Sequence, residues 1–255
     1  MHYTQVAPDS LHPPQEIPDP VDVAFVRGDR QLRTRGAAIA GPRALDCGSV
    51  GGMKPYDGRT ALIVVDVQND FADPKGSLAV TTGDEVIPVI NKEVGRARRA
   101  GSFVVYTQDW HPEHTPHFAR DGGQWPVHCV QQTWGAELHS LLSLQGPIVR
   151  KGANGEDGYS GFTMRDPIGG ATEPTELAGL LQERGIGRVV VCGLATDYCV
   201  KATALDAASL GFETTVLADA VRAVDLRPGD GDRALQDLTA AGVELAWAVE
   251  AGVPK

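Results

Sequence analysis

Three features that would indicate a membrane, secreted or nucleic-acid-binding protein are missing from this sequence. No apolar run approaches the roughly 20 residues needed to cross a bilayer, and the first residues lack the basic start and apolar stretch of a secretory signal. The 23 Lys and Arg residues are outnumbered by 33 Asp and Glu residues, which gives a formal net charge of −10. Phosphate binding needs clustered Lys and Arg, so we expect no nucleic-acid partner. The lack of a long apolar run leads us to expect no membrane partner.

Cysteine is also scarce, with four residues in a chain of 255: Cys47, Cys129, Cys192 and Cys199. So few and so scattered cysteines do not indicate the disulfide framework of a secreted domain. We therefore expect a reduced, cytoplasmic setting. Hydrophobic residues make up 42% of the chain and charged residues 22%, which is ordinary for a globular protein, so disorder across the whole chain is not expected.

Proline is concentrated near the start of the chain. Seven of the 17 prolines lie before residue 59, together with a glycine-rich stretch at 48–52. Because proline fixes φ and donates no backbone hydrogen bond, long helices and central strands are not expected there. The sequence therefore predicts an N-terminal extension over residues 1–58 and one large domain over residues 59–255.

From residue 60 onward, short apolar runs alternate with helical periodicity. The runs predict strands at 61–65, 103–106, 147–149, 189–192, 214–217 and 243–247. They are continuously apolar, which is typical of parallel strands covered on both faces. Helices are predicted between them, at about 84–99, 174–184, 197–209 and 229–241. This alternation predicts an α/β fold, a three-layer α/β/α sandwich with a mainly parallel, roughly six-stranded sheet.

Polar residues directly after the strands are candidates for a functional site, because open α/β sheets bind ligands beyond the carboxyl ends of their strands. Asp66 ends the first strand, where burial would raise the pKa of its carboxyl group toward that of a useful base. Lys151 ends the third strand, from which it could pair with a carboxylate and stabilise negative charge. A helix cap for Asp66 and a solvated surface position for Lys151 are the alternatives.

A dense group of histidines follows the second strand. Four of the chain's seven histidines lie there with one acid: Asp109, His111, His114, His117 and His128. A carboxylate and imidazoles on a proline-rich loop suit a borderline divalent ion such as Zn²⁺, Fe²⁺ or Mn²⁺. The set lacks a thiolate, so it does not indicate a zinc finger. Ordinary surface histidines are the alternative interpretation.

The fourth strand leads to Cys199. Thr196 or Asp197 can cap the helix that follows, which places Cys199 in its first turn. The helix dipole and free backbone N–H groups there would favour a thiolate and lower the pKa of the thiol. The same N–H groups could hold an oxyanion. The alternative is a small buried apolar cysteine, which is the role expected of Cys192 and Cys47.

In order and approximate spacing, these segments resemble the isochorismatase-like family of cysteine hydrolases, and most closely its nicotinamidase (pyrazinamidase) branch. The resemblance covers about residues 59–250. Each motif is weak alone, whereas five in order are a strong signal. The matching segments are 66–71 (DVQNDF), 109–111 (DWH) with 117–118 (HF), 125–129 (WPVHC), 151–152 (KG) with 159–162 (YSGF), and 193–200 (GLATDYCV).

The resemblance implies a catalytic role for three of these residues, because Asp66, Lys151 and Cys199 match the catalytic triad of the family. The bond between Leu194 and Ala195 matches a cis peptide of the family. The N–H groups of Ala195 and Cys199 would form the oxyanion hole beside it.

The resemblance also implies a metal centre and a substrate pocket. The family's metal ligands are matched by Asp109, His111 and His128, with His117 as the expected fourth ligand. His114 is the alternative fourth ligand, because the histidine spacing differs from that of many relatives. Three further residues match contacts of the substrate: Phe71 and Trp125, which would sandwich a pyridine ring, and Tyr159.

The resemblance implies that the protein hydrolyses nicotinamide, or a similar aromatic carboxamide, to nicotinate and ammonia through a cysteine thioester. The cofactor would be one divalent metal ion (Zn, Fe or Mn), the partner a small carboxamide, and the chain a possible homo-oligomer. Two alternatives are a metal-free hydrolase of the same group acting on another small amide or N-carbamoyl compound, and a catalytically silent metal-binding protein. A dinucleotide-binding oxidoreductase is disfavoured, since no G-x-G-x-x-G follows the first strand.

Overall fold

The structure is a computed structural model, and it describes residues 53–248. The extension predicted over residues 1–58 lies mostly outside the described residues, and so does Cys47. A domain boundary between residues 58 and 59 stays a prediction.

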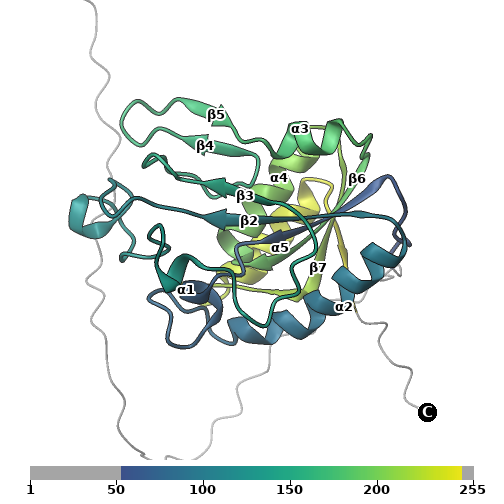
Figure 1. Ribbon diagram of the computed structural model, residues 1–255, viewed down its shortest axis with the longest axis horizontal. Coiled ribbons are helices and arrows are strands. Elements are labelled where there is room, and N and C mark those ends of the chain that lie inside the picture. Colours follow the sequence, from purple (N-terminus) through teal and green to yellow (C-terminus); the bar gives the residue numbers. More distant parts are fainter. Residues whose placement is uncertain (1–52, 249–255) are drawn as a thin grey trace, which may run out of the picture. The chain divides into compact units, whose positions relative to one another are not determined.

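A six-stranded parallel sheet forms the centre of the domain (Figure 1). The strands lie side by side in the order β3-β2-β1-β6-β7-β8, and every neighbouring pair is parallel. Their bounds are β1 Thr60–Val65, β2 Phe103–Asp109, β3 Ile148–Lys151, β6 Arg188–Leu194, β7 Glu213–Arg222 and β8 Glu244–Ala246. All six predicted strands are confirmed, and so is the predicted α/β class.

Helices cover both faces of this sheet. The longer ones are α2 Val86–Arg99, α3 Leu177–Gln182, α4 Lys201–Ser209 and α5 Asp230–Ala240, and α1 Asn69–Ala72 is a single turn. Single turns of 3₁₀ helix are η1 Gly83–Glu85, η2 Ala119–Asp121 and η3 Trp134–Ala136, and a π-helical turn, η4 Thr196–Val200, precedes α4. The helix predicted at 197–209 is therefore present as η4 and α4 together.

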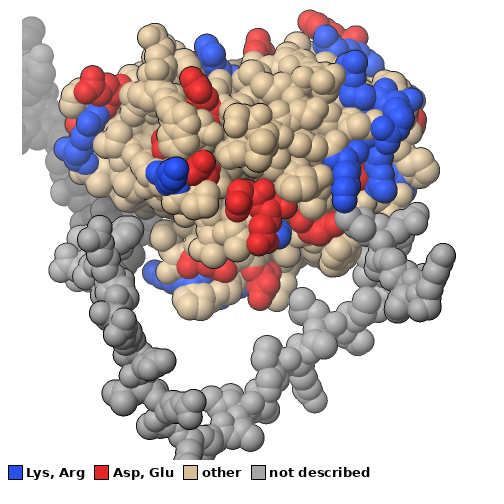
Figure 2. Space-filling model, turned by 60° about the horizontal axis from the view of Figure 1, so that its bottom comes forward, with Lys and Arg blue, Asp and Glu red and all other residues tan. Residues whose placement is uncertain are grey.

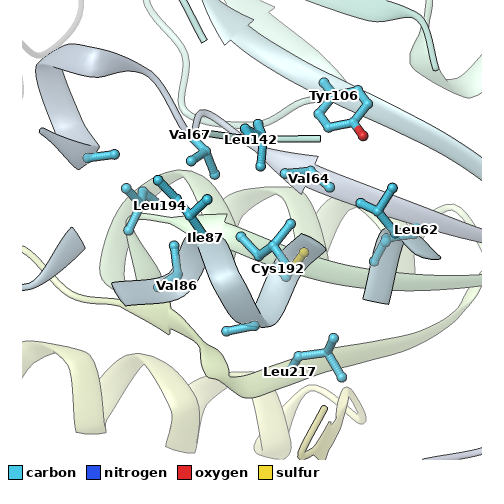
Figure 3. Packing of buried hydrophobic residues seen from close by; sticks show 14 of the residues in the cluster. Leu62, Val64, Val67, Val86, Ile87, Tyr106, Leu142, Cys192, Leu194 and Leu217 are labelled. Atoms are coloured by element: carbon cyan, nitrogen blue, oxygen red, sulfur yellow. The ribbon is translucent and has the colours of Figure 1, made fainter. Parts of the chain in front are cut away.

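Two hydrophobic clusters join the layers, one on each face of the sheet. Leu62 and Val64 of β1 belong to the cluster that includes residues of α2, whereas Ala61, Ile63 and Val65 belong to the cluster that includes residues of α3, α4 and α5. Figure 3 shows the first cluster, in which α2 residues face the sheet. Because successive residues of a strand point to opposite faces, a strand buried on both sides must be apolar throughout. This explains the continuous run in β1.

The elements that were not predicted include a two-stranded antiparallel sheet of β4 Thr163–Arg165 and β5 Thr172–Pro174. Its strands have three residues each, and all three residues of β5 are exposed. Because a sheet of this kind buries little apolar area, it leaves no apolar run in the sequence.

Charges of both signs lie at the surface. Figure 2 shows one face, where acidic side chains lie across the centre and basic side chains gather toward one side. The last turn of α2 carries Arg96, Arg98 and Arg99, an arrangement that complements the helix dipole. Within residues 53–248, no helix is both long and apolar enough to cross a membrane.

The boundary between β1 and β6 is a topological switch point, because the chain adds strands first on one side of it and then on the other. β2 and β3 are added on one side of β1, and β6, β7 and β8 on the other. A crevice opens at such a switch point, beyond the carboxyl ends of the two central strands. Asp66 follows β1 and Cys199 follows β6, so both candidate residues lie at this crevice.

Candidate active site

Cys199 lies in the turn that connects β6 to α4. Its segment leaves β6 through a cis peptide bond between Leu194 and Ala195, as the resemblance implied. Gly193 passes so close to β1 that an added Cβ would lie 2.1 Å from the Val65 carbonyl oxygen, and its φ is +118°. Only glycine fits this approach, which brings the Cys199 segment beside Asp66.

Lys151 stands at the centre of a buried group of charges. Its Nζ lies 2.9 Å from Asp66 Oδ2, pairs also with Asp109 Oδ1, and lies 3.7 Å from Cys199 Sγ. One carboxylate oxygen of Asp66, one of Asp109 and the Cys199 sulfur lie within 4.8 Å of one another. The structure therefore brings the three residues of the predicted triad together in one place.

Thr107 orients Asp66 and was not identified from the sequence. Its hydroxyl group donates a hydrogen bond of 2.6 Å to Asp66 Oδ1. Asp66 Oδ2 is buried and has no aligned hydrogen-bond donor, although Lys151 Nζ is near enough for an ion pair. This second oxygen is thus the one available to accept a proton.

The protonation states in this group follow from burial and from Lys151. Burial raises the pKa of the Asp66 carboxyl group, and the Lys151 ammonium offsets only part of this effect. Burial also acts to raise the pKa of Asp109, but Lys151, with His111 and His128, outweighs it and holds that pKa well below its usual range. Burial opposes the charge of Lys151, yet the two carboxylates raise its pKa well above its usual value. The group therefore holds a fixed ammonium ion, a fixed carboxylate and a carboxyl group that can take up a proton.

The expected lowering of the pKa of the Cys199 thiol was wrong. Only 6% of Cys199 is exposed, and burial raises the pKa of the thiol well above its usual value, an effect that Lys151 only partly opposes. The sequence placed Cys199 at a helix start but could not show that this start lies beneath other segments. A buried neutral thiol needs a base beside it.

Three of the predicted metal ligands converge beside this group. One ring nitrogen each of His111, His117 and His128 lies within 4.8 Å of the others, and all three side chains are buried. His114 is not part of this cluster, because it is exposed and lies 3.1 Å from Asp121. The geometry therefore favours His117 over His114 as the further histidine.

Two of the three histidines are oriented by contacts of the kind that metal-binding histidines usually make. His117 Nδ1 lies 2.8 Å from Asp157 Oδ1, and His128 Nδ1 lies 2.7 Å from the Pro126 carbonyl oxygen. Bonds of this kind fix the tautomer and leave Nε2 free as a ligand. Neither ring nitrogen of buried His111 has a hydrogen-bond partner, which is costly unless a ligand satisfies it. This chemistry fits a divalent metal ion.

Asp109 lies at the border between the two groups. Its Oδ1 faces Lys151, and its Oδ2 lies 3.8 Å from His111 Nε2. The structure thus places it next to the histidine cluster, while its shortest contact is with the lysine. Its role as a metal ligand stays a prediction.

Two residues of the 66–71 segment make further positioning contacts. Gln68 donates to the carbonyl oxygen of Asp109 and accepts from its N–H group, both at 2.8 Å. Asp70 Oδ2 accepts a hydrogen bond of 2.7 Å from the backbone of Cys129, the residue after His128. The sequence pattern singled out this segment but gave no sign of these contacts, because they join residues 41 and 59 positions apart.

A pocket opens onto both groups. The predicted substrate contacts Phe71, Trp125 and Tyr159 all line it, as does Cys199. The Tyr159 hydroxyl group accepts a hydrogen bond of 2.9 Å from Trp125 Nε1, which fixes both rings in the wall. The other residues lining the pocket are Leu78, Val80, Asp109, His117, His128, Gly158, Ala195, Tyr198 and Val224.

Comparisons with known proteins agree with this geometry. The isochorismatase domain matches residues 60–248. Nicotinamidases of Escherichia coli and Acinetobacter baylyi are 38% and 42% identical to the chain, over 72% of its length and 93% and 90% of theirs.

Solved structures give the same result. A pyrazinamidase of Pyrococcus horikoshii in complex with zinc is 42% identical, with a TM-score of 0.67, over 74% of this chain and 99% of that one. A protein of L. infantum in complex with nicotinate is 38% identical, with a TM-score of 0.69, over 76% and 96%. The chain belongs to the isochorismatase family, within which it is similar to the nicotinamidases and pyrazinamidases.

Proposed function

We propose that this chain is an amidohydrolase that converts nicotinamide, or a similar aromatic carboxamide, to nicotinate and ammonia through a thioester on Cys199. The observation that carries the proposal is the position of the Cys199 sulfur, 3.7 Å from Lys151 Nζ and within 4.8 Å of a carboxylate oxygen of Asp66, in a pocket beside three converging histidines. The similarity to nicotinamidases supports it.

Cys199 enters the reaction as a neutral thiol, because its pKa is raised. Asp66 takes the thiol proton through Oδ2 while the sulfur attacks the carbonyl carbon of the amide. Lys151 stabilises the negative charge that develops, and the N–H groups of Ala195 and Cys199 are the expected donors to the carbonyl oxygen.

Asp66 then returns the proton to the amide nitrogen. The C–N bond breaks, ammonia leaves, and the acyl group remains on Cys199 as a thioester. Water attacks the thioester with Asp66 as the base, the C–S bond breaks, and the proton restores the thiol. The sum is nicotinamide plus water giving nicotinate plus ammonium.

His111, His117 and His128 are the residues that would hold a divalent metal ion, with Asp109 beside them. An imidazole-rich set suits Zn²⁺, Fe²⁺ or Mn²⁺. When bound, such an ion would act as a Lewis acid beside the substrate pocket. The aromatic wall formed by Phe71, Trp125 and Tyr159 orients the ring.

The lining of the pocket favours an aromatic amide over an N-carbamoyl acid. Among the described residues that line it, Asp109 is the acid and none is lysine or arginine. Relatives with lower identity include a ureidoacrylate amidohydrolase at 31% and an N-carbamoylsarcosine amidase at 29%. A carboxylate on the substrate would have no lysine or arginine of the wall as its partner, whereas the aromatic side chains of the wall suit a flat ring. N-carbamoyl acids are therefore expected to be poorer substrates than an aromatic amide.

Ammonia release from a panel of amides tests the proposal. The metal-loaded protein should hydrolyse nicotinamide and leave N-carbamoylsarcosine and ureidoacrylate unchanged, and Cys199→Ala should abolish turnover. Cys192→Ala is the matched control, because Cys192 is buried in β6 away from the pocket. Undiminished activity of Cys199→Ala would reject the nucleophile, and full activity after metal removal would favour a metal-free hydrolase.

A further inference from the structure

Asp197 joins the nucleophile segment to a wall of the pocket. It lies in η4, two residues before Cys199. Its Oδ1 accepts a hydrogen bond of 2.9 Å from the backbone N–H of Val224, and its Oδ2 accepts one of 3.0 Å from that of Asp225. Hydrogen bonds to an ionised carboxylate are stronger than those between neutral groups. One side chain therefore holds two successive peptide groups.

The segment that Asp197 holds follows the end of β7 and is anchored at its other side as well. Asp225 has a φ of +54°, and its Oδ1 accepts a hydrogen bond of 2.8 Å from the backbone of Gly231 at the start of α5. An added Cβ at Gly231 would lie 2.6 Å from the Ala223 Cβ, so the two segments are in close contact. The position of Val224 is thus set between η4 and α5.

Val224 is part of the pocket itself. Its partly buried side chain lines the pocket and packs against the hydrophobic cluster that includes Phe71 and Val80. Because Asp197 and Cys199 lie in the same turn, a hydrogen bond from Val224 to Asp197 fixes the distance between this wall and the sulfur. That distance limits the size of the substrate ring that can reach the Cys199 sulfur.

We propose that Asp197 is a positioning residue that sets the size selectivity of the pocket, and that Val224 is the residue through which it acts. The proposal rests on the proposed function, and it narrows the substrate class to carboxamides of a single six-membered aromatic ring. A fused two-ring amide would meet Val224.

The test compares nicotinamide with quinoline-3-carboxamide in steady-state kinetics of the metal-loaded full-length protein. Val224→Ala and Asp197→Ala should each raise the ratio of kcat/KM for the larger amide over the smaller by about tenfold, the effect of small changes in an apolar pocket. The double variant should show nearly the same ratio as Val224→Ala, because both changes act through one wall.

Asp166→Ala is the matched control. Asp166 also accepts hydrogen bonds from two successive backbone N–H groups, those of Ile168 at 2.8 Å and Gly169 at 3.1 Å, but it does not line the substrate pocket. The kcat/KM ratio of the two amides in Asp166→Ala should stay within about twofold of the wild-type value, since Asp166 has no contact with the wall formed by Val224.

Two outcomes would overturn the inference: an unchanged ratio in Val224→Ala, or a parallel loss of kcat/KM for both amides in Asp197→Ala, which indicates a merely structural role. Should Asp197→Ala fail to fold, Asp197→Asn, which keeps one acceptor oxygen, must move the ratio in the same direction. If the wild-type protein does not hydrolyse nicotinamide, the proposed function fails separately. The selectivity is then measured from the binding of the two amides to the same variants.

Discussion

At the scale of single residues, Lys151 organises the chemistry of the site. It lies between the buried carboxyl groups of Asp66 and Asp109 and contacts the Cys199 sulfur. A buried charge is tolerated only with close partners, and removing one partner leaves the others uncompensated. These four residues therefore form a single electrostatic unit. Because of this coupling, the pKa of Asp66 can be raised while that of Asp109 is lowered.

Asp157 belongs to the same scale, and we predict that it supports metal binding through His117. Its carboxylate accepts a hydrogen bond from His117 Nδ1, which lowers the pKa of Asp157. Asp157→Ala should weaken metal affinity about 10- to 100-fold, because the ring loses its fixed orientation. Competition with a metal chelator measures this affinity directly.

The control for that prediction is Asp121→Ala. It removes a similar histidine–carboxylate pair, that of Asp121 with His114, outside the cluster. Equal metal affinity in the wild-type protein and Asp157→Ala would contradict the prediction, and so would equal losses in the two variants.

At the scale of elements, the strands and the residues that follow them could be predicted from the sequence. Continuous apolar runs marked the six parallel strands, and the rule that sites lie at their carboxyl ends selected Asp66, Lys151 and Cys199. The raised pKa of Cys199 could not be predicted, because it depends on burial by segments distant in sequence. Thr107 and Gln68 act through contacts with residues 41 positions away in the sequence, and these contacts therefore left no local pattern.

Helix α2 contains a buried carboxyl group outside the site. Glu93 is 1% exposed, its Oε1 accepts a hydrogen bond of 2.8 Å from Arg96, and its Oε2 has no partner. Burial raises the pKa of Glu93 above its usual value of 4.5, although Arg96 opposes the shift. The folded protein therefore binds this proton more tightly than the unfolded chain does. The protonated Glu93 carboxyl group therefore contributes to stability below pH 4.5, and this contribution is lost as the pH rises through the raised pKa of Glu93.

We predict that Glu93→Gln removes this loss. The free energy of unfolding of the variant should exceed that of the wild-type protein increasingly as the pH rises above 4.5, by about 1.4 kcal/mol for each unit of the pKa shift. Urea unfolding at several pH values measures the difference. The control is Glu183→Gln, because the side chain of Glu183, directly after α3, is exposed. Parallel pH profiles for wild type and Glu93→Gln would count against a raised pKa.

At the scale of the whole molecule, the residues just before β1 belong to the packed domain. The Arg188 guanidinium group donates to the carbonyl oxygens of Lys54 and Pro55, and the Ser102 hydroxyl group donates to that of Asp57 at 2.6 Å. Tyr56 packs against the hydrophobic cluster next to α2. The core of the domain is thus continuous with residues 53–58.

A pair of truncated chains tests where the domain begins. We predict that residues 59–255 unfold at a midpoint at least about 5 °C below that of residues 53–255, because Arg188 and Ser102 lose hydrogen-bond partners in the shorter chain. Thermal unfolding followed by circular dichroism provides the comparison. Equal midpoints would place the start of the domain at residue 59 and show that these contacts add nothing.

The most direct test of the whole account is mass spectrometry of the metal-loaded protein, quenched with acid during turnover of nicotinamide. The account predicts a transient nicotinoyl thioester that fragmentation of the modified peptide assigns to Cys199, and none on Cys129 or Cys192. Nicotinate formed at the normal rate in Cys199→Ala, or an acyl group found on another residue, would contradict it.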